Sequence, residues 1–235
     1  MTITSQGEGV RERHARFLRE RDHLEHSAIR TLLSQVLRPE DNCVDIGANS
    51  GDILREMVGL APLGRHLAFE PIPALAERLV RDFPGVDVRQ CAIADRGGRM
   101  SFFHVIEEPA LSSLRVLPYF QGHSFERIEV DVVDLDSSLP DSYTPRVIKI
   151  DVEGAEIDVL RGAMRTITRH RPILIIEFQR DGAGAFEVGP ADLYDLICRE
   201  AGMRLFDVFG EGPFGREELR KAFHARRLIN YVAHP

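Results

Sequence analysis

The chain has few of the features that mark nucleic-acid-binding or disulfide-stabilised proteins. Its 235 residues include 30 lysines and arginines against 37 aspartates and glutamates, a formal net charge of −7. Because binding to a phosphate backbone depends on a surplus of basic residues, we expect no nucleic-acid partner. Cys43, Cys91 and Cys198 are widely spaced and form no CxxC pair. We therefore expect small core residues rather than a disulfide framework or a thiolate zinc site.

Long apolar runs are also missing. Runs such as residues 172–176 are far too short to span a bilayer, and the first residues lack the apolar core of a signal peptide. The sequence therefore predicts a cytoplasmic protein without membrane contact. The length and the hydrophobic content of 43% fit one α/β domain better than two. We expect an N-terminal helical extension at residues 1–41 and a single domain at residues 42–235.

Residues 10–37 carry apolar side chains at helical spacing, with arginine and glutamate between them. This pattern predicts two helices, or one broken helix, packed on the domain. The polar residues 1–9 predict a frayed terminus. The arginines at positions 11–21 are interspersed with acids, which favours a solvated face over an anion-binding surface. The amphipathic segment could also pair with a second copy of the chain, so a homodimer stays open.

Beyond residue 42, buried strands alternate with helices. We expect strands at residues 43–46, 67–70, 86–93, 146–150 and 172–178, with helices at about 50–60, 74–82, 155–169 and 191–201. Such alternation requires a parallel sheet with right-handed crossovers. Two further strands at residues 203–209 and 228–232, with a short helix at 217–224 between them, complete the sheet.

Three segments do not follow this alternation. Residues 99–106 and 127–133 have the alternating pattern of half-exposed strands. Between them, residues 107–124 contain prolines, a glycine and scattered aromatic residues without a clear period. The aromatic residues favour a segment that covers the substrate site rather than a linker, and a packed surface excursion stays open. The glycine-rich residues 181–185 predict a flexible loop.

Informative residues follow the ends of five predicted parallel strands. Ligands of parallel sheets bind at the carboxyl ends of the strands, where the strand order reverses. Acids or glycines occur at each of these ends: Asp45 to Gly51, Glu70, Ala92 to Asp95, Asp151 to Glu156, and Glu177. We therefore expect one ligand site along this edge of the sheet.

The first strand end indicates the ligand. GxxxxGK[ST] does not occur in the chain, and this turn does not match GxGxxG, because Gly47 and Gly51 are four residues apart and Asp45 precedes them. Glycines allow a sharp turn and close approach of a ligand. Asp45 would repel a pyrophosphate but suits a cation such as S-adenosylmethionine (SAM), which carries an ammonium and a sulfonium group. Glu70 follows at the distance where such folds place an acid against a ribose.

Several motifs together resemble the FkbM-type SAM-dependent methyltransferases. They are VDIGANSG at residues 44–51, FEP at 69–71, LSSL at 111–114, IKIDVEGAE at 148–156 and IIE at 175–177. The resemblance covers roughly residues 42–180, and IKIDVEGAE is its most specific part. It implies a Rossmann-like class I methyltransferase fold: a mostly parallel seven-stranded sheet with an antiparallel last strand and helices on both faces. It also implies O-methylation of a hydroxyl on a polyketide, a sugar or another secondary metabolite, as in antibiotic biosynthesis.

The resemblance also assigns the cofactor residues. Asp45, Gly47, Asn49 and Gly51 would surround the methionine part of SAM. Glu70, with Pro71 beside it, would bind the ribose hydroxyls, and Ala92 would lie along the adenine.

Methyl transfer to an alcohol needs an in-line approach and a base that takes the proton. We expect Asp151 near the reacting centre and Glu153 or Glu177 as base or substrate anchor. For Glu153 and Glu156, a role as negative charges that complement the dipole at a helix N-terminus stays open. The histidines near the cover, His104 and His123, are more often structural. Asp151 and Glu153 could also bind Mg²⁺, but no further ligand cluster is evident in the sequence, so we expect no metal.

Two alternatives stay open. A nicotinamide-dependent enzyme on a doubly wound sheet would share the role of Glu70, but it predicts a GxGxxG motif after the first strand, where the sequence has GANSG at residues 47–51. A SAM-binding protein that has lost catalysis would have lost the acids at the strand ends, whereas all of them are present.

Overall fold

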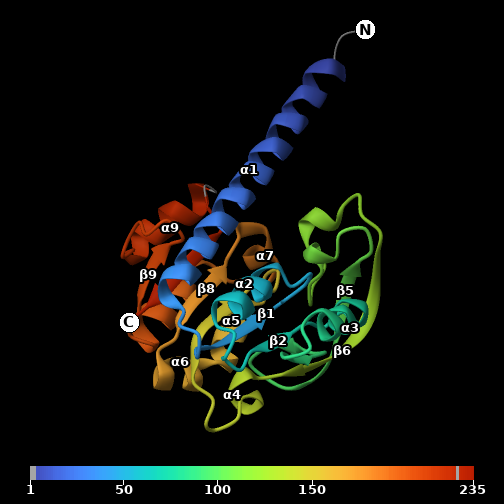
Figure 1. Cartoon of the computed structure of the whole chain (residues 1–235). Helices are drawn as coiled ribbons and strands as arrows, with labels where there is room; N and C mark the ends of the chain where they lie inside the picture. The colour runs from blue at the N-terminus through green and yellow to red at the C-terminus, as the bar shows by residue number, and fades with distance from the viewer. Residues whose placement is uncertain (1–3, 226–227) are drawn as a thin grey trace.

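A seven-stranded sheet forms the centre of the protein (Figure 1). The computed structural model describes residues 4–225 and 228–235, with side chains from residue 20 onward. The strand order is β3-β2-β1-β7-β8-β10-β9, and the strands are β1 Asn42–Ile46, β2 Leu67–Phe69, β3 Asp87–Arg89, β7 Pro145–Ile150, β8 Ile173–Glu177, β9 Arg204–Asp207 and β10 Asn230–His234. Neighbouring strands from β3 to β8 are parallel, and β10 is antiparallel to both β8 and β9. The predicted mostly parallel sheet with an antiparallel last strand is confirmed.

Helices cover both faces of this sheet, because side chains along a strand alternate between the two faces. On one face Cys43 of β1 and Val147 of β7 pack against α1 Thr4–Val36 and α2 Asp52–Leu60. α3 Pro73–Asp82 joins the same face beside β2. On the other face Val44 and Ile148 pack against α5 Glu156–Gly162, α6 Met164–His170, α8 Pro190–Tyr194 and α9 Arg216–Ala225. Among the described residues, no helix has the length and apolar character needed to cross a membrane.

The N-terminal segment is one continuous helix, α1, rather than two helices or one broken helix. The frayed terminus predicted at residues 1–9 is wrong for residues 4–9, which belong to α1, and residues 1–3 lie outside the described residues. Its first half extends away from the sheet (Figure 1). The second half docks through Ile29 and Leu33, which are buried. The buried carboxylate of Glu25 accepts hydrogen bonds from the backbone N–H groups of Ile229 and Asn230. The side chains of the arginines at positions 11–19 lie outside the described residues.

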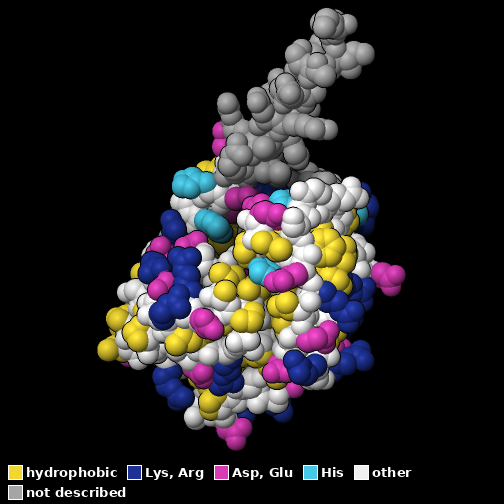
Figure 2. Space-filling model, turned by 90° about the vertical axis from the view of Figure 1, so that its right-hand side faces the viewer, with side chains coloured by type: hydrophobic (Ala, Val, Ile, Leu, Met, Phe, Trp, Pro, Cys, Tyr) yellow, Lys and Arg dark blue, Asp and Glu magenta, His cyan; other side chains and the backbone are white. Residues whose placement is uncertain are grey.

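The strand expected at residues 86–93 is in fact two strands in different sheets. β3 ends at Arg89, whose carbonyl oxygen accepts a hydrogen bond from the Cys91 N–H, and the chain turns there. β4 Ala92–Ile93 then joins a second sheet of order β4-β6-β5, with β5 Gly98–Val105 and β6 Phe125–Val133. β5 and β6 confirm the two predicted half-exposed strands. Acidic and basic side chains lie interspersed on the face of the molecule that Figure 2 shows.

Other boundaries also differ from the expectation. The segment expected as a loop at residues 181–185 is the helix α7 Arg180–Ala185, because Gly182 lets it pack directly against Gly154. The helix expected at residues 155–169 is divided into α5 and α6 at Ala163. The helix expected at 191–201 consists of α8 and a π-helix, η3 Asp195–Glu200. The cover at residues 107–124 contains two short 3-10 helices, η1 Pro109–Leu111 and η2 Pro118–Phe120, and α4 Leu135–Ser138 follows β6.

We predict that the docking of α1 depends on its buried face. Leu33 is fully buried, whereas Leu24 on the same helix is 58% exposed. Leu33→Ala should lower the free energy of unfolding by about 2–5 kcal/mol, because it leaves a cavity in the core. Leu24→Ala is the matched control and should change it by less than about 0.5 kcal/mol. Urea unfolding of both variants tests this, and equal effects would contradict the packing of α1.

Candidate active site

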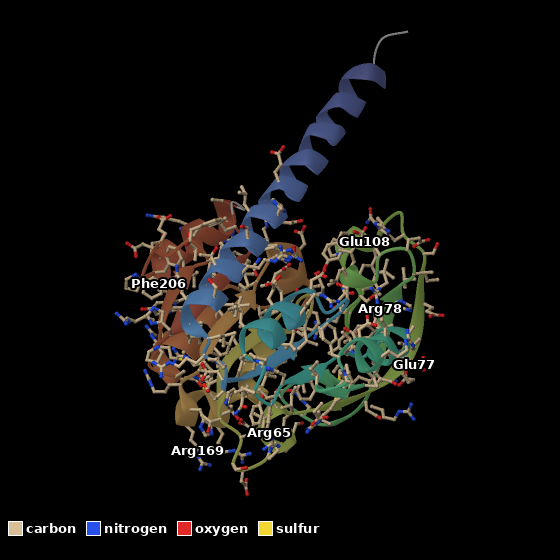
Figure 3. The ribbon with its side chains drawn as sticks, in the orientation of Figure 1. Arg65, Glu77, Arg78, Glu108, Arg169 and Phe206 are labelled. Carbon is tan, nitrogen blue, oxygen red and sulfur yellow. The ribbon has the colours of Figure 1, made fainter. Side chains whose placement is uncertain are left out.

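The predicted strand ends meet in one cavity of about 1110 Å³. Its wall comes from the carboxyl ends of β1, β2, β7 and β8, from the cover, from α1 and from the start of α7. Glu108 of the cover is one of the lining residues and lies on the upper part of the molecule (Figure 3). Of the ten predicted site residues, nine line the cavity: Asp45, Gly47, Asn49, Glu70, Pro71, Ala92, Asp151, Glu153 and Glu177.

The exception is Gly51, which does not line the cavity but shapes the turn before α2. It has a φ of +82°, and an added Cβ would lie 2.6 Å from the ring of Phe83. Gly47 has a φ of +76°, and a Cβ there would lie 1.8 Å from the carbonyl oxygen of Asp151. Only glycine fits either position. Gly47 thus lets the turn after β1 approach the turn after β7, and Gly51 lets the same turn approach the side chains of Leu79 and Phe83.

Glu70 joins this turn to the end of β2. Its Oε2 accepts a hydrogen bond of 2.8 Å from the Asn49 N–H, and its Oε1 accepts one of 2.9 Å from the Ile72 N–H. The side chain is buried, and this burial raises the pKa of Glu70 to about 7. Each carboxylate oxygen has further lone-pair capacity. Glu70 can therefore accept hydrogen bonds from a pair of ligand hydroxyls.

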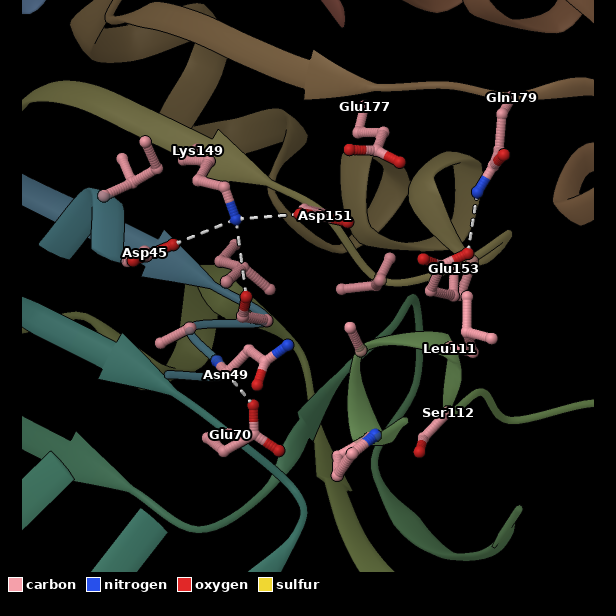
Figure 4. Close-up of a pocket in the computed structure, with 18 of the residues that line it drawn as sticks. Asp45, Asn49, Glu70, Leu111, Ser112, Lys149, Asp151, Glu153, Glu177 and Gln179 are labelled. Carbon is pink, nitrogen blue, oxygen red and sulfur yellow. Dashed lines mark hydrogen bonds and ion pairs between the residues drawn. The ribbon is translucent and has the colours of Figure 1, made fainter. Parts of the chain in front are cut away.

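A buried lysine, Lys149, links two acids at the sheet centre (Figure 4). Asp45 and Lys149 are directly paired on neighbouring strands. The Lys149 Nζ lies 3.5 Å from Asp45 Oδ1, 3.1 Å from Asp151 Oδ2 and 3.4 Å from the Gly47 carbonyl oxygen. Burial alone would lower the pKa of Lys149, but the carboxylates of Asp151 and Asp45 raise it above its ordinary value. Lys149 is therefore a fixed cation between Asp151 and the turn at residues 47–51, which we call the glycine turn.

Asp45 is the most buried acid of the site. Among the described residues, neither of its carboxylate oxygens has a hydrogen bond of ordinary geometry. Burial raises the pKa of Asp45, and Lys149 opposes that rise. A buried carboxylate is costly when its compensation comes mainly from one cation, here the Lys149 Nζ at 3.5 Å. The arrangement favours a cationic ligand near this residue.

The three predicted catalytic acids form a cluster beyond Lys149. Carboxylate oxygens of Asp151, Glu153 and Glu177 all lie within 4.8 Å of one another. Glu153 Oε2 accepts hydrogen bonds from the Tyr119 hydroxyl and from Gln179 Nε2, the latter at 2.8 Å. Burial and the nearby Asp151 raise the pKa of both Glu153 and Glu177. At least one carboxyl of the cluster therefore keeps a proton to a higher pH than a free carboxyl does.

Such a cluster could also hold a divalent cation, since carboxylates are the usual ligands of Mg²⁺ and Ca²⁺. Acidic groups at this spacing are common without a metal. The expectation that the protein needs no metal stays a prediction.

Sequence reasoning missed three residues that hold the acids in place: Lys149, Tyr119 and Gln179. Lys149 had a signal, a lone charge inside the apolar run of β7. Tyr119 and Gln179 had none, because they meet Glu153 only across sequence separations of 34 and 26 residues. α1 also contributes Arg21, Asp22 and His26 to the cavity wall, whereas His104 and His123 are not among the lining residues.

Comparisons with known proteins find similarity to methyltransferases. Residues 45–205 match the family described as "Methyltransferase FkbM domain". The chain is 30% identical over 158 residues to 2-O-methyltransferase NoeI of Sinorhizobium fredii (strain NBRC 101917 / NGR234), covering 60% of this chain and 65% of that protein. It is also 30% identical over 147 residues to Methyltransferase 1 of Beauveria bassiana (strain ARSEF 2860), covering 53% and 59%. The chain thus spans less than two thirds of the length of these two relatives.

Two solved structures share the fold. The methyltransferase FkbM from Methylobacillus flagellatus KT superposes with a TM-score of 0.52 at 20% identity, covering 85% of this chain and 44% of that chain. The plantazolicin methyltransferase BpumL, in complex with S-adenosylhomocysteine (SAH), gives 0.51 at 10% identity, covering 95% and 88%. At these identities the likeness concerns the fold alone, which is that of class I SAM-dependent methyltransferases.

We predict that the acid cluster makes stability depend on pH. The folded protein holds the Glu177 proton more tightly than the unfolded chain, where the pKa is near 4.5. This contribution is complete below that pH and is lost as the pH rises through the raised pKa of the folded state. Between pH 5 and pH 9 the free energy of unfolding should fall, and Glu177→Gln should make this fall smaller.

Urea unfolding at several pH values measures this effect. Glu77→Gln is the control, because Glu77 is an exposed carboxylate on the outer side of α3 (Figure 3). The same pH dependence in the wild type and in Glu177→Gln would show that Glu177 is not held in this environment.

Proposed function

We propose that this chain, which belongs to the FkbM methyltransferase family, transfers the methyl group of SAM to a hydroxyl of a small molecule. The observation that carries the proposal is the convergence of Glu70, Asp45 and the acid cluster on one cavity. The acceptor class that we favour is a secondary metabolite such as a polyketide or a sugar. The name of the relative NoeI, a 2-O-methyltransferase, supports oxygen as the methylated atom.

The residues of the cavity fit SAM in three places. Glu70 has two buried oxygens that can accept hydrogen bonds from the ribose hydroxyls. Asp45 and the turn at residues 47–51 would hold the methionine part, with the negative charge of Asp45 matching a cationic ligand. Pro71 and Ala92 are buried in the cavity wall and would flank the nucleoside.

SAM supplies an activated methyl group on a sulfonium centre. The contribution of the protein is to hold the acceptor oxygen in line with that group and to receive the hydroxyl proton. Asp151 accepts a hydrogen bond from Lys149 through its Oδ2. Its role would therefore be electrostatic, as a negative charge near the reacting centre. Glu153 and Glu177 have raised pKa values, which suits groups that exchange a proton near neutral pH. These two are therefore our candidates for the base and the acceptor anchor.

The two alternatives have less support. For a nicotinamide-dependent enzyme, a pyrophosphate would lie near Asp45 and would be repelled by its buried carboxylate. For a SAM-binding protein without catalysis, the cluster of three acids next to Lys149 would have no purpose. Burying several carboxylates together lowers the free energy of unfolding.

Several further expectations remain proposals. They are a cytoplasmic location, the absence of a nucleic-acid partner, a homodimer formed through α1, and a division into an N-terminal helical extension at residues 1–41 and a methyltransferase domain at residues 42–235. In the structure α1 packs on the same core cluster as β1 and β7. Size-exclusion chromatography with light scattering would settle whether the chain dimerises.

Isothermal titration calorimetry tests the proposed function. SAM should bind and NAD should not. Glu70→Gln should weaken SAM binding by about tenfold or more, because it removes charged acceptors of hydrogen bonds, whereas the exposed control Glu77→Gln should bind like the wild type. The same titration in the presence of a chelator should be unchanged if no metal is needed. Binding of NAD without binding of SAM would refute the proposal.

A further inference from the structure

Glu153 is held by three segments that are far apart in the sequence. Tyr119 of η2 and Gln179 just before α7 both donate to the same carboxylate oxygen, Oε2. Ser113 of the cover donates from its Oγ to the backbone carbonyl oxygen of Glu153 at 2.7 Å. The cover and the β8–α7 connection therefore fix both the backbone and the side chain of this residue.

The backbone at Glu153 has an unusual conformation that the surroundings impose. Its φ is +53°, in the left-handed region that non-glycine residues seldom adopt. At the next residue, Gly154, an added Cβ would lie 2.8 Å from the carbonyl oxygen of Gly182. Conformations of this kind persist where neighbouring contacts enforce them, often at functional sites. The turn thus presents the Glu153 carboxylate in one direction.

The cover is also anchored next to this point. Arg115 donates a hydrogen bond of 2.8 Å from its Nη1 to the carbonyl oxygen of Ala185, and its guanidinium lies 4.6 Å from the ring centre of Phe186. These contacts join the cover to α7 on the side of Glu153. They keep Tyr119 within reach of the carboxylate.

We propose that Tyr119 and Gln179 are positioning residues for the proton acceptor of the methyl transfer. By occupying Oε2 of Glu153, they leave Oε1 as the oxygen that receives the proton. Figure 4 shows the oxygen not bonded to Gln179 turned toward Asp151 and Glu177. The inference rests on the proposed function and specifies its base.

The transfer balances with Glu153 in this role. The acceptor O–H bond breaks and its proton moves to Oε1 of Glu153. The acceptor oxygen forms the new bond to the methyl carbon, and the electron pair of the broken carbon–sulfur bond stays on sulfur. No further reactant is required.

The charged groups around Glu153 explain why the hydrogen bonds from Tyr119 and Gln179 affect its ionisation. The titratable groups that face it directly or through the cluster are Asp151, Glu156, Glu177, Lys149 and Tyr119. Most of these are acids, so together with burial they disfavour the ionised carboxylate. The hydrogen bonds from Tyr119 and Gln179 favour it. Removing either donor should therefore raise the pH at which Glu153 becomes a base.

The affinities of SAM and SAH as a function of pH provide the test. Both ligands share the parts that Glu70 and Asp45 would contact, but only SAM carries the sulfonium charge. The ratio of the two affinities therefore reports the ionisation of carboxylates near the transferred methyl group. In the wild type the ratio should rise with pH in favour of SAM. Glu153→Gln should flatten this rise.

In Tyr119→Phe and in Gln179→Leu the midpoint of the rise should move up by about one pH unit, as expected for a lost hydrogen bond to a charged group. Tyr143→Phe is the matched control, because the Tyr143 hydroxyl donates to the carbonyl oxygens of Cys43 and Arg65 and lies outside the cavity wall. It should lower the melting temperature and leave the midpoint unchanged.

The possible outcomes distinguish a failure of the proposed function from a failure of the positioning role of Tyr119 and Gln179. If wild-type protein binds neither SAM nor SAH, the proposed function fails. If both bind but the midpoint in Tyr119→Phe and Gln179→Leu equals that of the wild type, the positioning role is wrong. A wild-type ratio that does not vary with pH would equally exclude Glu153 as the group next to the methyl. Because Gln179 is a second donor to the same oxygen, Gln179→Leu decides the test if Tyr119→Phe does not fold.

Discussion

The ammonium ion of Lys149, buried between Asp45 and Asp151, is the interaction on which the site depends. It joins β1 to β7 through a directly paired residue on each strand and also contacts the Gly47 carbonyl oxygen. Removing one partner of a buried ion pair leaves an uncompensated charge, which typically costs about 3–5 kcal/mol. Lys149 therefore couples the glycine turn, where we place the cofactor, to the acids, where we place the chemistry.

The parallel sheet provides the geometry for this coupling. Strand ends that are distant in the sequence meet at one edge, so Glu70 after β2 and Glu177 at the end of β8 line the same cavity as Asp45. The remaining walls come from less regular parts of the chain, the cover and α1. This division is common in proteins in which a rigid scaffold positions the functional groups and connecting segments contact the ligand.

Much of the scaffold could be predicted from the sequence, because strands buried on both faces appear as continuous apolar runs and their ends locate the acids. The break between β3 and β4 could not, since Gln90 and Cys91 carry no turn signal. α7 was mistaken for a loop because its glycines, which usually favour turns, serve here to let Gly182 approach Gly154. The contacts of Tyr119 and Gln179 with Glu153 depend on tertiary packing and leave no local pattern.

The most direct test of the account is the affinity for SAM after removal of the buried cation. The chain has two lysines, Lys149 in the site and Lys221, which is exposed on α9. Calorimetry should show that Lys149→Met weakens SAM binding by at least about tenfold, because the group that holds Asp45, Asp151 and the Gly47 carbonyl oxygen in position is lost and this outweighs the removal of a positive charge. Lys149→Arg should keep part of the affinity and Lys221→Met all of it. A folded Lys149→Met variant that binds SAM as tightly as the wild type would contradict the account.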